Sequence, residues 1–359
     1  MLYYLYYLRN FYSPLNVFQY STFRSVYAAL TALAISFLIG GYIIRKLKER
    51  KIGQLIRSDG PSTHRVKEGT PTMGGLIILL SMVASVLLWA RPDNPYVIVV
   101  FLAVVWFGAL GFVDDYLKFF RQSPKGLIMR YKLLGQILGA VAIAVFLYYH
   151  PASPQWPVHV KIPLLKSPVN FGWLYFLFIV FVIVGSSNAV NLTDGLDGLA
   201  IGTFIFSAMA FSVVAYLVGH VKFSEYLKII HIGASSELTV FCAAMVGASL
   251  GFLWYNSHPA EVFMGDVGSL ALGGALGTIA VMIKQELLLI LICGIFVVEA
   301  VSVILQIISF RFFQKRIFLM APLHHHFEVR GMPESKIVIR FWILAIIFAL
   351  ASLSLLKLR

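Results

Sequence analysis

Apolar segments long enough to cross a lipid bilayer recur along the whole chain. A helix needs about 20 predominantly apolar residues to cross the hydrocarbon core. Hydrophobic residues make up 59% of the 359 residues and charged residues only 13%, whereas about 25% of a soluble globular chain is charged. Strands of a membrane barrel would alternate over about 10 residues, and these segments do not. We therefore expect an all-α polytopic membrane protein, with residues 1–359 forming a single membrane domain.

The apolar segments predict about ten transmembrane helices. The expected spans are residues 24–44, 74–90, 95–113, 133–149, 172–187, 199–219, 237–254, 268–283, 287–309 and 337–356. The eighth span is short and rich in glycine, which predicts close packing against a neighbouring helix. Between the fourth and fifth spans, residues 150–171 contain the alternating stretch VHVKI, which predicts a small β-hairpin.

The distribution of basic residues predicts how the spans are oriented. Loops that follow odd-numbered spans contain 18 of the 29 lysine and arginine residues, whereas the opposite face contains ten. Because basic residues are enriched in cytoplasmic loops, we expect these loops to be cytoplasmic, and both termini and the hairpin to be periplasmic. Much of the net charge of +13 follows from this asymmetry, so it implies no nucleic-acid partner.

Two adjacent carboxylates, Asp114 and Asp115, follow the third expected span in GFVDDYLKFF. On a helix they would point about 100° apart, so we expect them to have different roles. Asp114 and Lys118 are four residues apart and would share a helix face. They could form a simple ion pair at a helix end, but two carboxylates at a membrane boundary favour metal binding or acid–base chemistry.

Four polar residues recur every three positions in NAVNLTDGLDGLA: Asn188, Asn191, Asp194 and Asp197. This spacing can align them along one side of a tight helical turn, and the neighbouring glycines allow a ligand to approach closely. Asn and Asp are also common in turns, so a capped turn between helices is the alternative. The segment contains no lysine or arginine, which favours a divalent cation or a basic neighbouring loop as its partner.

Asp266 precedes the eighth expected span in NSHPAEVFMGDVGSL. It could be the N-cap of that helix. In the same segment, Asn256 and Phe263 offer amide and aromatic contacts that suit a nucleobase.

The segment HRVKEGTPTMGG could bind a phosphate. Lys67, Thr70 and Thr72 lie beside glycines, so an ammonium group, hydroxyls and backbone N–H groups could surround an anion. The spacing differs from that of a Walker A loop, so this signal is weak by itself.

Three consecutive histidines, His324, His325 and His326, lie in the last loop that we expect to be cytoplasmic. The unusual polar groups thus gather at one membrane face. Their oxygen-rich side chains suit magnesium, or manganese, better than zinc, and the zinc-hydrolase pattern H-E-x-x-H is absent. We therefore expect the histidines to contact phosphate or position a ligand, unless one or two of them merely brace the loop.

Five motifs occur in the order found in a known family: EGTPTMGG, DDYLK, NAVNLTDGLDGLA, FMGDVGSLALG and APLHHHFE. Together they resemble the phospho-N-acetylmuramoyl-pentapeptide transferases, the bacterial translocases of peptidoglycan synthesis, over nearly the whole chain. The wider superfamily of polyprenyl-phosphate hexosamine-1-phosphate transferases includes members that use UDP-N-acetylglucosamine and usually have an interrupted histidine motif. The uninterrupted triplet favours the muramoyl-pentapeptide branch.

The resemblance implies a reaction, a cofactor and an assembly. UDP-MurNAc-pentapeptide and undecaprenyl phosphate would give lipid I and UMP in a magnesium-dependent transfer at the cytoplasmic face of the bacterial inner membrane. The family also implies a homodimer. Direct attack by the lipid phosphate and a covalent aspartyl intermediate both fit these residues.

The resemblance also implies roles for individual residues. Asp266 would bind magnesium, and Asp114, supported by Asp115, would orient or deprotonate the lipid phosphate; all three are candidate metal ligands. The histidine triplet would engage the diphosphate or the muramoyl-peptide. The expected substrate contacts are Lys67, Thr70, Thr72, Lys118, Lys132, Asn188, Asn191 and Asp194 for the diphosphate and sugar, and Asp197, Asn256 and Phe263 for the uridine.

Two other protein classes are alternatives. A secondary transporter would need polar groups near the bilayer midplane on broken helices. Here Glu299 is the only acidic residue well inside an expected span, and we interpret it as a partnered structural carboxylate. An intramembrane aromatic prenyltransferase would also use paired aspartate motifs with magnesium, but it would leave the histidine triplet unexplained.

Overall fold

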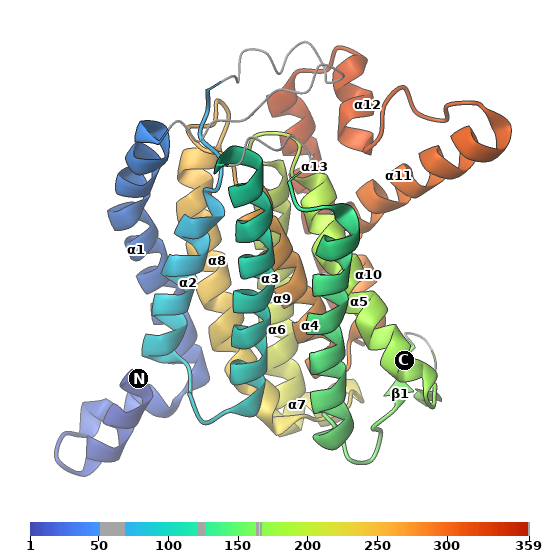
Figure 1. Ribbon diagram of the computed structural model, residues 1–359. Coiled ribbons are helices and arrows are strands. Elements are labelled where there is room, and N and C mark those ends of the chain that lie inside the picture. Colours follow the sequence, from blue (N-terminus) through green and yellow to red (C-terminus); the bar gives the residue numbers. More distant parts are fainter. Residues whose placement is uncertain (51–68, 121–125, 163–164, 166, 358–359) are drawn as a thin grey trace.

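The computed structural model describes residues 1–50, 69–120, 126–162, 165 and 167–357. Most of its helices run side by side as a bundle, and one leaves the bundle at an angle (Figure 1). In chain order, with η for a 3-10 helix, the elements are η1 (Leu2–Asn10), η2 (Ser13–Gln19), α1 (Ser21–Glu49), α2 (Gly75–Trp89), α3 (Pro95–Phe120), α4 (Met129–Tyr149), β1 (His159–Val160), β2 (Val169–Asn170), α5 (Leu174–Thr193), α6 (Leu199–Gly219), α7 (Val221–Leu227), η4 (Gly233–Ser235), α8 (Ser236–Asn256), α9 (Gly265–Met282), α10 (Glu286–Ile292), α11 (Gly294–Phe313), α12 (Leu323–Val329) and α13 (Glu334–Leu355).

Most of the helices agree with the expected spans. In the described part of the chain, nine helical segments are long and apolar enough to cross a membrane, and the 15-residue α2 coincides with the expected span 74–90. The described strands, β1 and β2, form one antiparallel pair in which Val160 lies opposite Val169. The all-α polytopic class and the small hairpin within residues 150–171 are therefore confirmed.

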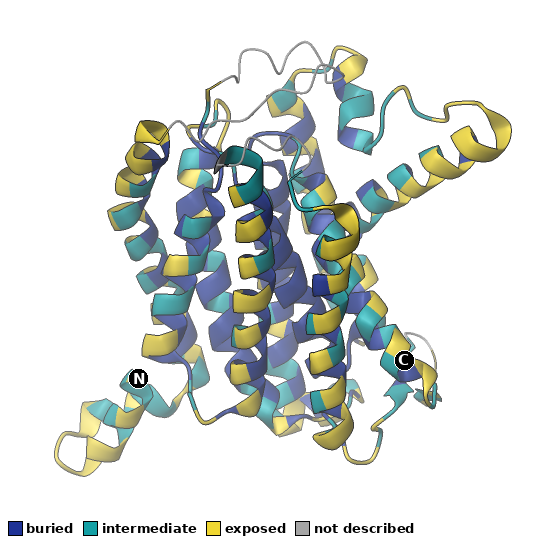
Figure 2. Cartoon of the chain, in the orientation of Figure 1, coloured by how far each residue is buried: buried dark blue, intermediate teal, exposed yellow. Residues whose placement is uncertain are grey.

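Helix α9 is the most buried helix of the bundle. In its most apolar window 89% of the residues are buried, against 28% in α1, and Figure 2 shows the buried residues concentrated in the middle of the bundle. It packs against α3 and α5. A Cβ atom on Gly273 would lie 2.4 Å from the backbone oxygen of Ser186 in α5. The close packing predicted for this glycine-rich segment is therefore confirmed.

Helix α3 is longer than the expected span 95–113. It continues to Phe120, so Asp114 and Asp115 lie within the helix and not after its end. Lys118 lies one turn further on, where its ion pairs with the aspartates stabilise the continuing helix. A Cβ atom on Gly111 would lie 2.1 Å from the backbone oxygen of Asp266. Helices α3 and α9 therefore touch next to their carboxylates.

The ninth expected span is divided into two helices. Cys293 separates α10 from α11, so the prediction of one continuous helix over residues 287–309 is wrong. Gly294 follows the break, and a Cβ atom there would lie 2.7 Å from the ring of Phe348 in α13. After the break α11 leaves the bundle sideways (Figure 1), and its outer half is exposed (Figure 2). Apolar periodicity continues through the break, which is why the sequence did not predict it.

The two ends of the bundle differ in what they contain. The N-terminal η1, the end of α13 and the β-hairpin lie at one end (Figure 1). An even number of spans predicts this placement of the termini. The other end contains α12, the end of α3 and the start of α13. The described parts of the predicted functional segments belong to the elements that meet at this second end, called the site end below.

Candidate active site

Carboxylates from α3 and α9 form the centre of the candidate site. One oxygen atom each of Asp114, Asp115 and Asp266 lies within 4.8 Å of the others. Asp114 and Asp115 are buried, and Asp266 is partly exposed. Carboxylate oxygens are the ligands that magnesium prefers in proteins. The structure thus brings together the three aspartates expected to be metal ligands, and their chemistry fits that ion.

Two lysines lie against these carboxylates. Lys118 Nζ is 2.5 Å from Asp114 Oδ2 and 2.9 Å from Asp266 Oδ2. Lys132 Nζ, from α4, is 2.6 Å from the same oxygen of Asp266 and 3.5 Å from Asp114 Oδ2. Three carboxylates and two ammonium groups leave the cluster with a net negative charge. This charge favours a divalent cation, and the ammonium groups can donate hydrogen bonds to phosphate oxygens.

Backbone N–H groups fix the two aspartates of α3. The N–H of Val267 donates to Asp115 Oδ2 over 3.1 Å, and the N–H of Leu127 donates to Asp114 Oδ1 over 2.7 Å. Asp115 therefore satisfies a free donor in the first turn of α9. Asp266 lies within that turn and Met264 precedes the helix without a side-chain cap. The alternative of Asp266 as an N-cap is therefore wrong.

The two asparagines of α5 have different surroundings. Asn191 Nδ2 donates to Asp266 Oδ1 over 2.7 Å and to Ser269 Oγ over 2.8 Å. Asn188 Nδ2 instead donates to Gln136 Oε1 over 2.9 Å. The structure thus places Asn191 in direct contact with the carboxylate cluster, whereas Asn188 ties α5 to α4 beside it.

Asp194 follows the end of α5 and borders the cluster. Burial raises the pKa of its carboxyl group to about 8, and the negative charges of Asp266 and Asp115 add to the rise. A cation beside this carboxyl group would lower its pKa again, because opposite charge favours the ionised form. This electrostatic environment also fits a metal ion.

The segment around Thr72 packs directly on the start of α9. The N–H of Phe263 donates to the oxygen of Pro71, and the N–H of Gly74 donates to the oxygen of Phe263, both over 2.8 Å. Thr72 is buried and Thr70 is partly exposed. Lys67, expected as a phosphate ligand, lies outside the described residues.

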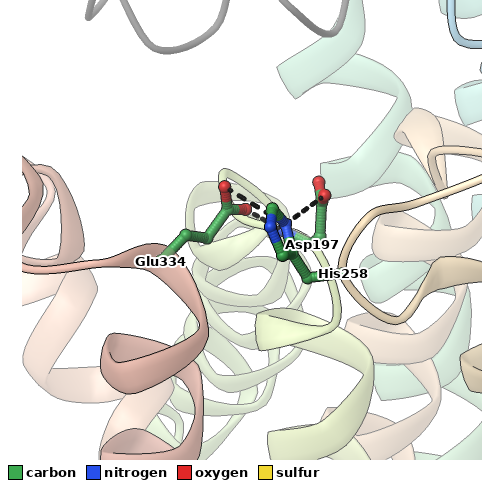
Figure 3. Close-up of side chains that lie close together, drawn as sticks. All are labelled: Asp197, His258 and Glu334. Carbon is green, nitrogen blue, oxygen red and sulfur yellow. Dashed lines mark hydrogen bonds and ion pairs between the residues drawn. The ribbon is translucent and has the colours of Figure 1, made fainter.

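Asp197 and Asn256 shape a second part of the site. Asn256 is 3% exposed, accepts a hydrogen bond from the Gly198 N–H over 3.0 Å and donates to the Val262 oxygen over 2.9 Å. Its amide therefore holds two loops together. Asp197 lies with His258 and Glu334 at the same place (Figure 3).

The three histidines lie in α12 and have different partners. His324 is fully buried, with Nδ1 3.2 Å from Glu299 Oε2. His325 Nδ1 is 3.0 Å from Glu328 Oε2. His326 Nδ1 accepts a hydrogen bond from the Leu319 N–H over 3.1 Å. The interpretation of Glu299 as a partnered carboxylate is confirmed.

Several residues that the structure places at the site were not predicted from the sequence. Glu328 is three residues after His325, a helical spacing that could have indicated the pair. Ser269 is likewise three residues after Asp266. Gln136, His258 and Glu334 come from distant segments, and their positions in the sequence carry no such signal.

The site end thus combines a cluster of carboxylates, the ammonium groups of Lys118 and Lys132, and the amide of Asn191 at one end of the helix bundle. Groups of this kind bind and orient phosphates by neutralising their charge.

Comparisons of the sequence with known proteins show the family. Residues 97–284 match the model of glycosyl transferase family 4, and residues 67–79 match signature 1 of phospho-N-acetylmuramoyl-pentapeptide-transferase. The chain is 51% identical to the phospho-N-acetylmuramoyl-pentapeptide-transferase of Endomicrobium trichonymphae, and the match covers 100% of both chains. It belongs to the phospho-N-acetylmuramoyl-pentapeptide-transferase family. The family transferases of Citrifermentans bemidjiense, 52% identical over 100% of both chains, and of Thermodesulfovibrio yellowstonii, 53% identical over 99% of both, agree.

Membership of this transferase family confirms the resemblance found in the five motifs. The chain is a multi-pass membrane protein of a family of transferases. The alternatives of a secondary transporter and an aromatic prenyltransferase are not supported.

Proposed function

We propose that the protein transfers phospho-MurNAc-pentapeptide from UDP-MurNAc-pentapeptide to undecaprenyl phosphate, giving lipid I and UMP for peptidoglycan synthesis. The observation that carries this proposal is the cluster of Asp114, Asp115 and Asp266 with Lys118 and Lys132. It lies where a lipid phosphate at the membrane surface and a water-soluble nucleotide can meet. The names of the family members support the substrate class.

The chain's own residues can position both phosphates. Asp114 would accept a proton from the lipid phosphate or orient it, while Lys118 and Lys132 would turn from Asp266 to the diphosphate oxygens. In a direct transfer, an oxygen of the lipid phosphate would attack the β-phosphorus of the nucleotide, and the bond from that phosphorus to the oxygen of UMP would break. Magnesium, held by Asp266 with Asp114 and Asp115, would neutralise charge on the diphosphate; manganese would serve similarly.

The other residues expected to contact the substrate lie around the carboxylate cluster. Asn191 and Asp194 border the cluster. Asp197 and Phe263 lie in loops and Asn256 at the end of α8, and the uridine would bind there. The excess of basic residues in loops of the site end supports a cytoplasmic position for this end, and the protein would then act in the bacterial inner membrane. The family further suggests a homodimer.

The test is an assay of the purified full-length protein with undecaprenyl phosphate and magnesium. We expect UMP and lipid I from UDP-MurNAc-pentapeptide, no UMP from UDP-N-acetylglucosamine, and loss of both products after chelation. Asp266→Asn should reduce turnover by about 10²–10³-fold, the cost of losing one group that stabilises charge in a transition state. UMP from UDP-N-acetylglucosamine alone would assign the protein to the sister branch, and no UMP from either nucleotide would contradict the proposal.

The choice between a direct and a two-step transfer needs a separate experiment. A single turnover of UMP without undecaprenyl phosphate would support a covalent aspartyl intermediate. No release of UMP without the lipid would support direct attack.

A further inference from the structure

Three segments that are distant in the sequence meet at Asp197, His258 and Glu334 (Figure 3). Asp197 comes from the loop between α5 and α6, His258 from the loop between α8 and α9, and Glu334 is the first residue of α13. In Figure 3 the His258 ring lies between the two carboxylates. The side chain of Asp197 is 2% exposed and that of Glu334 is 11% exposed, whereas that of His258 is 44% exposed.

Glu334 forms a hydrogen bond with the backbone of the aspartate-rich loop, residues 194–198 between α5 and α6. Its Oε1 accepts a hydrogen bond from the N–H of Asp197 over 2.6 Å, and its Oε2 is 3.7 Å from His258 Nδ1. The other side of Asp197 is held as well, since its Oδ2 accepts from the Ala260 N–H over 3.1 Å and is 3.1 Å from His258 Nδ1. Hydrogen bonds with a charged partner are about twice as strong as neutral ones.

Helix α13 contacts the loop at a second point. The indole N–H of Trp342 donates to the oxygen of Gly198 over 3.1 Å. Trp342 follows Glu334 by eight residues, which is a little more than two helical turns. Gly198 has a φ of +76°, and its N–H donates to Asn256. Two turns of α13 therefore hold two adjacent residues of the loop.

We propose that Glu334 is a positioning residue, which fixes the Asp197 loop in the conformation that binds the nucleotide part of the substrate. This inference rests on the function proposed above and deepens it. Asp194, at the other end of the same short loop, borders Asp266, so displacement of Asp197 also shifts the nucleotide relative to the carboxylate cluster. We expect binding of the lipid substrate to change little, because the lipid phosphate would contact Asp114, Lys118 and Lys132 and not this loop.

A cation site is the competing explanation for the three side chains. One nitrogen and two oxygen atoms of Asp197, His258 and Glu334 lie within 4.8 Å of one another. Each of these residues, however, already has a partner within the group or in the backbone of the loops. Hydrogen bonds among these residues and the loop backbone therefore account for their proximity without an ion.

The test compares Glu334→Ala with Glu334→Gln in the full-length protein, with wild type and Ser335→Ala as controls. The glutamine keeps an oxygen that can accept from the Asp197 N–H, whereas alanine removes it. Ser335 is the exposed neighbour on α13 and lies outside the cluster. We expect Glu334→Ala to raise KM for UDP-MurNAc-pentapeptide by about 10–100-fold, the range for one lost hydrogen bond to a charged group, with KM for undecaprenyl phosphate unchanged. Glu334→Gln should recover part of the loss, because its amide oxygen can still accept a hydrogen bond from the Asp197 N–H, although a weaker, neutral one.

A binding measurement separates this inference from the proposed reaction. Calorimetric titration of UMP needs no turnover, and we expect Glu334→Ala to weaken UMP binding while thermal unfolding shows the variant folded. An unchanged KM and UMP affinity in folded Glu334→Ala would overturn the inference. So would stoichiometric zinc binding by the wild type that Glu334→Ala abolishes. A wild type that binds UMP but makes no lipid I would instead contradict the proposed function.

Discussion

Nε2 of His324 lies so close to Gly195 that a Cβ atom on that glycine would be 2.3 Å from it. The other ring nitrogen of His324 is 3.2 Å from Glu299 in α11. The first histidine of the triplet thus connects a carboxylate inside a membrane helix to the aspartate-rich loop. Its neighbours His325 and His326 have partners of their own at the edge of α12.

Gly195→Ala should therefore displace the loop that contains Asp194 and Asp197. The new methyl group would overlap the His324 ring, and misplacement of catalytic groups by about 1 Å can cost about 10²-fold in rate. We expect kcat/KM for UMP release to fall by about that factor. The matched control is Gly185→Ala in α5, where a Cβ atom meets nothing within 4 Å. Equal activity of the two variants would show that the contact has no effect on the site.

The asparagines of α5 should differ when each is replaced by alanine. Asn191→Ala removes the donor to Asp266 and Ser269, so kcat should fall by about 10–100-fold, the effect of one lost hydrogen bond to a charged group. Asn188→Ala breaks the bond to Gln136, which is 1% exposed. This change should lower Tm and alter kcat much less. Kinetics and thermal unfolding of both variants test the distinction, and a larger kcat loss for Asn188→Ala would contradict it.

The apolar pattern predicted the helices well, because spans of about 20 residues dominate this chain. It was wrong where a helix ends inside an apolar segment and where a helix continues beyond one. Cys293 interrupts an apolar segment, and Asp114 continues a helix that the pattern ended, since Lys118 pairs with it. Neither effect is visible in hydrophobicity alone.

The candidate site was predictable where residues occur in motifs and unpredictable where tertiary contacts bring them in. The carboxylates of α3 and α9 were expected together and lie together. Sequence spacing could not reveal that Asn188 turns to Gln136 while Asn191 faces Asp266. Nor could it reveal Glu334, which reaches Asp197 across 137 residues of sequence.

A buried ion pair near the start of α1 should contribute strongly to stability. The guanidinium of Arg24 donates to both oxygens of Glu237, over 2.6 and 2.7 Å, and to the oxygen of Trp89. Their side chains are 1% and 6% exposed. Glu237→Gln leaves a buried charge without its counterpart, which costs about 3–5 kcal/mol. We expect a clear fall in Tm and unchanged kcat in the protein that remains folded.

An exposed ion pair nearby serves as the control for the buried pair of Arg24 and Glu237. Arg91 and Asp93 form an ion pair whose side chains are 37% and 49% exposed. Such pairs contribute about 0–1 kcal/mol, so Asp93→Asn should leave Tm almost unchanged. The double variant Arg24→Met with Glu237→Met should recover part of the loss seen in Glu237→Gln. A Tm for Glu237→Gln equal to that of Asp93→Asn would refute the assigned role.

Lys284 should make the stability of the protein depend on pH. It lies between α9 and α10, is 1% exposed and donates from Nζ to the oxygens of Pro157 and of His159, the first residue of β1. Burial lowers the pKa of its ammonium group from 10.5 to about 8. Between these two values the unfolded chain binds a proton that the folded protein does not, so the free energy of unfolding rises with pH across this window.

We therefore expect the difference in Tm between the wild type and Lys284→Met to increase in favour of the wild type as pH rises from 7.5 to 9.5. The gain corresponds to at most about 2 kcal/mol, since one pKa unit is worth about 1.4 kcal/mol. Lys284→Met should also unfold earlier at every pH, because the two backbone oxygens lose their donor. Lys222→Met, at an exposed lysine of α7, controls for the loss of one positive charge. A Tm difference that narrowed with rising pH would mean that the ammonium form of Lys284 is favoured by folding, contrary to the effect of its burial.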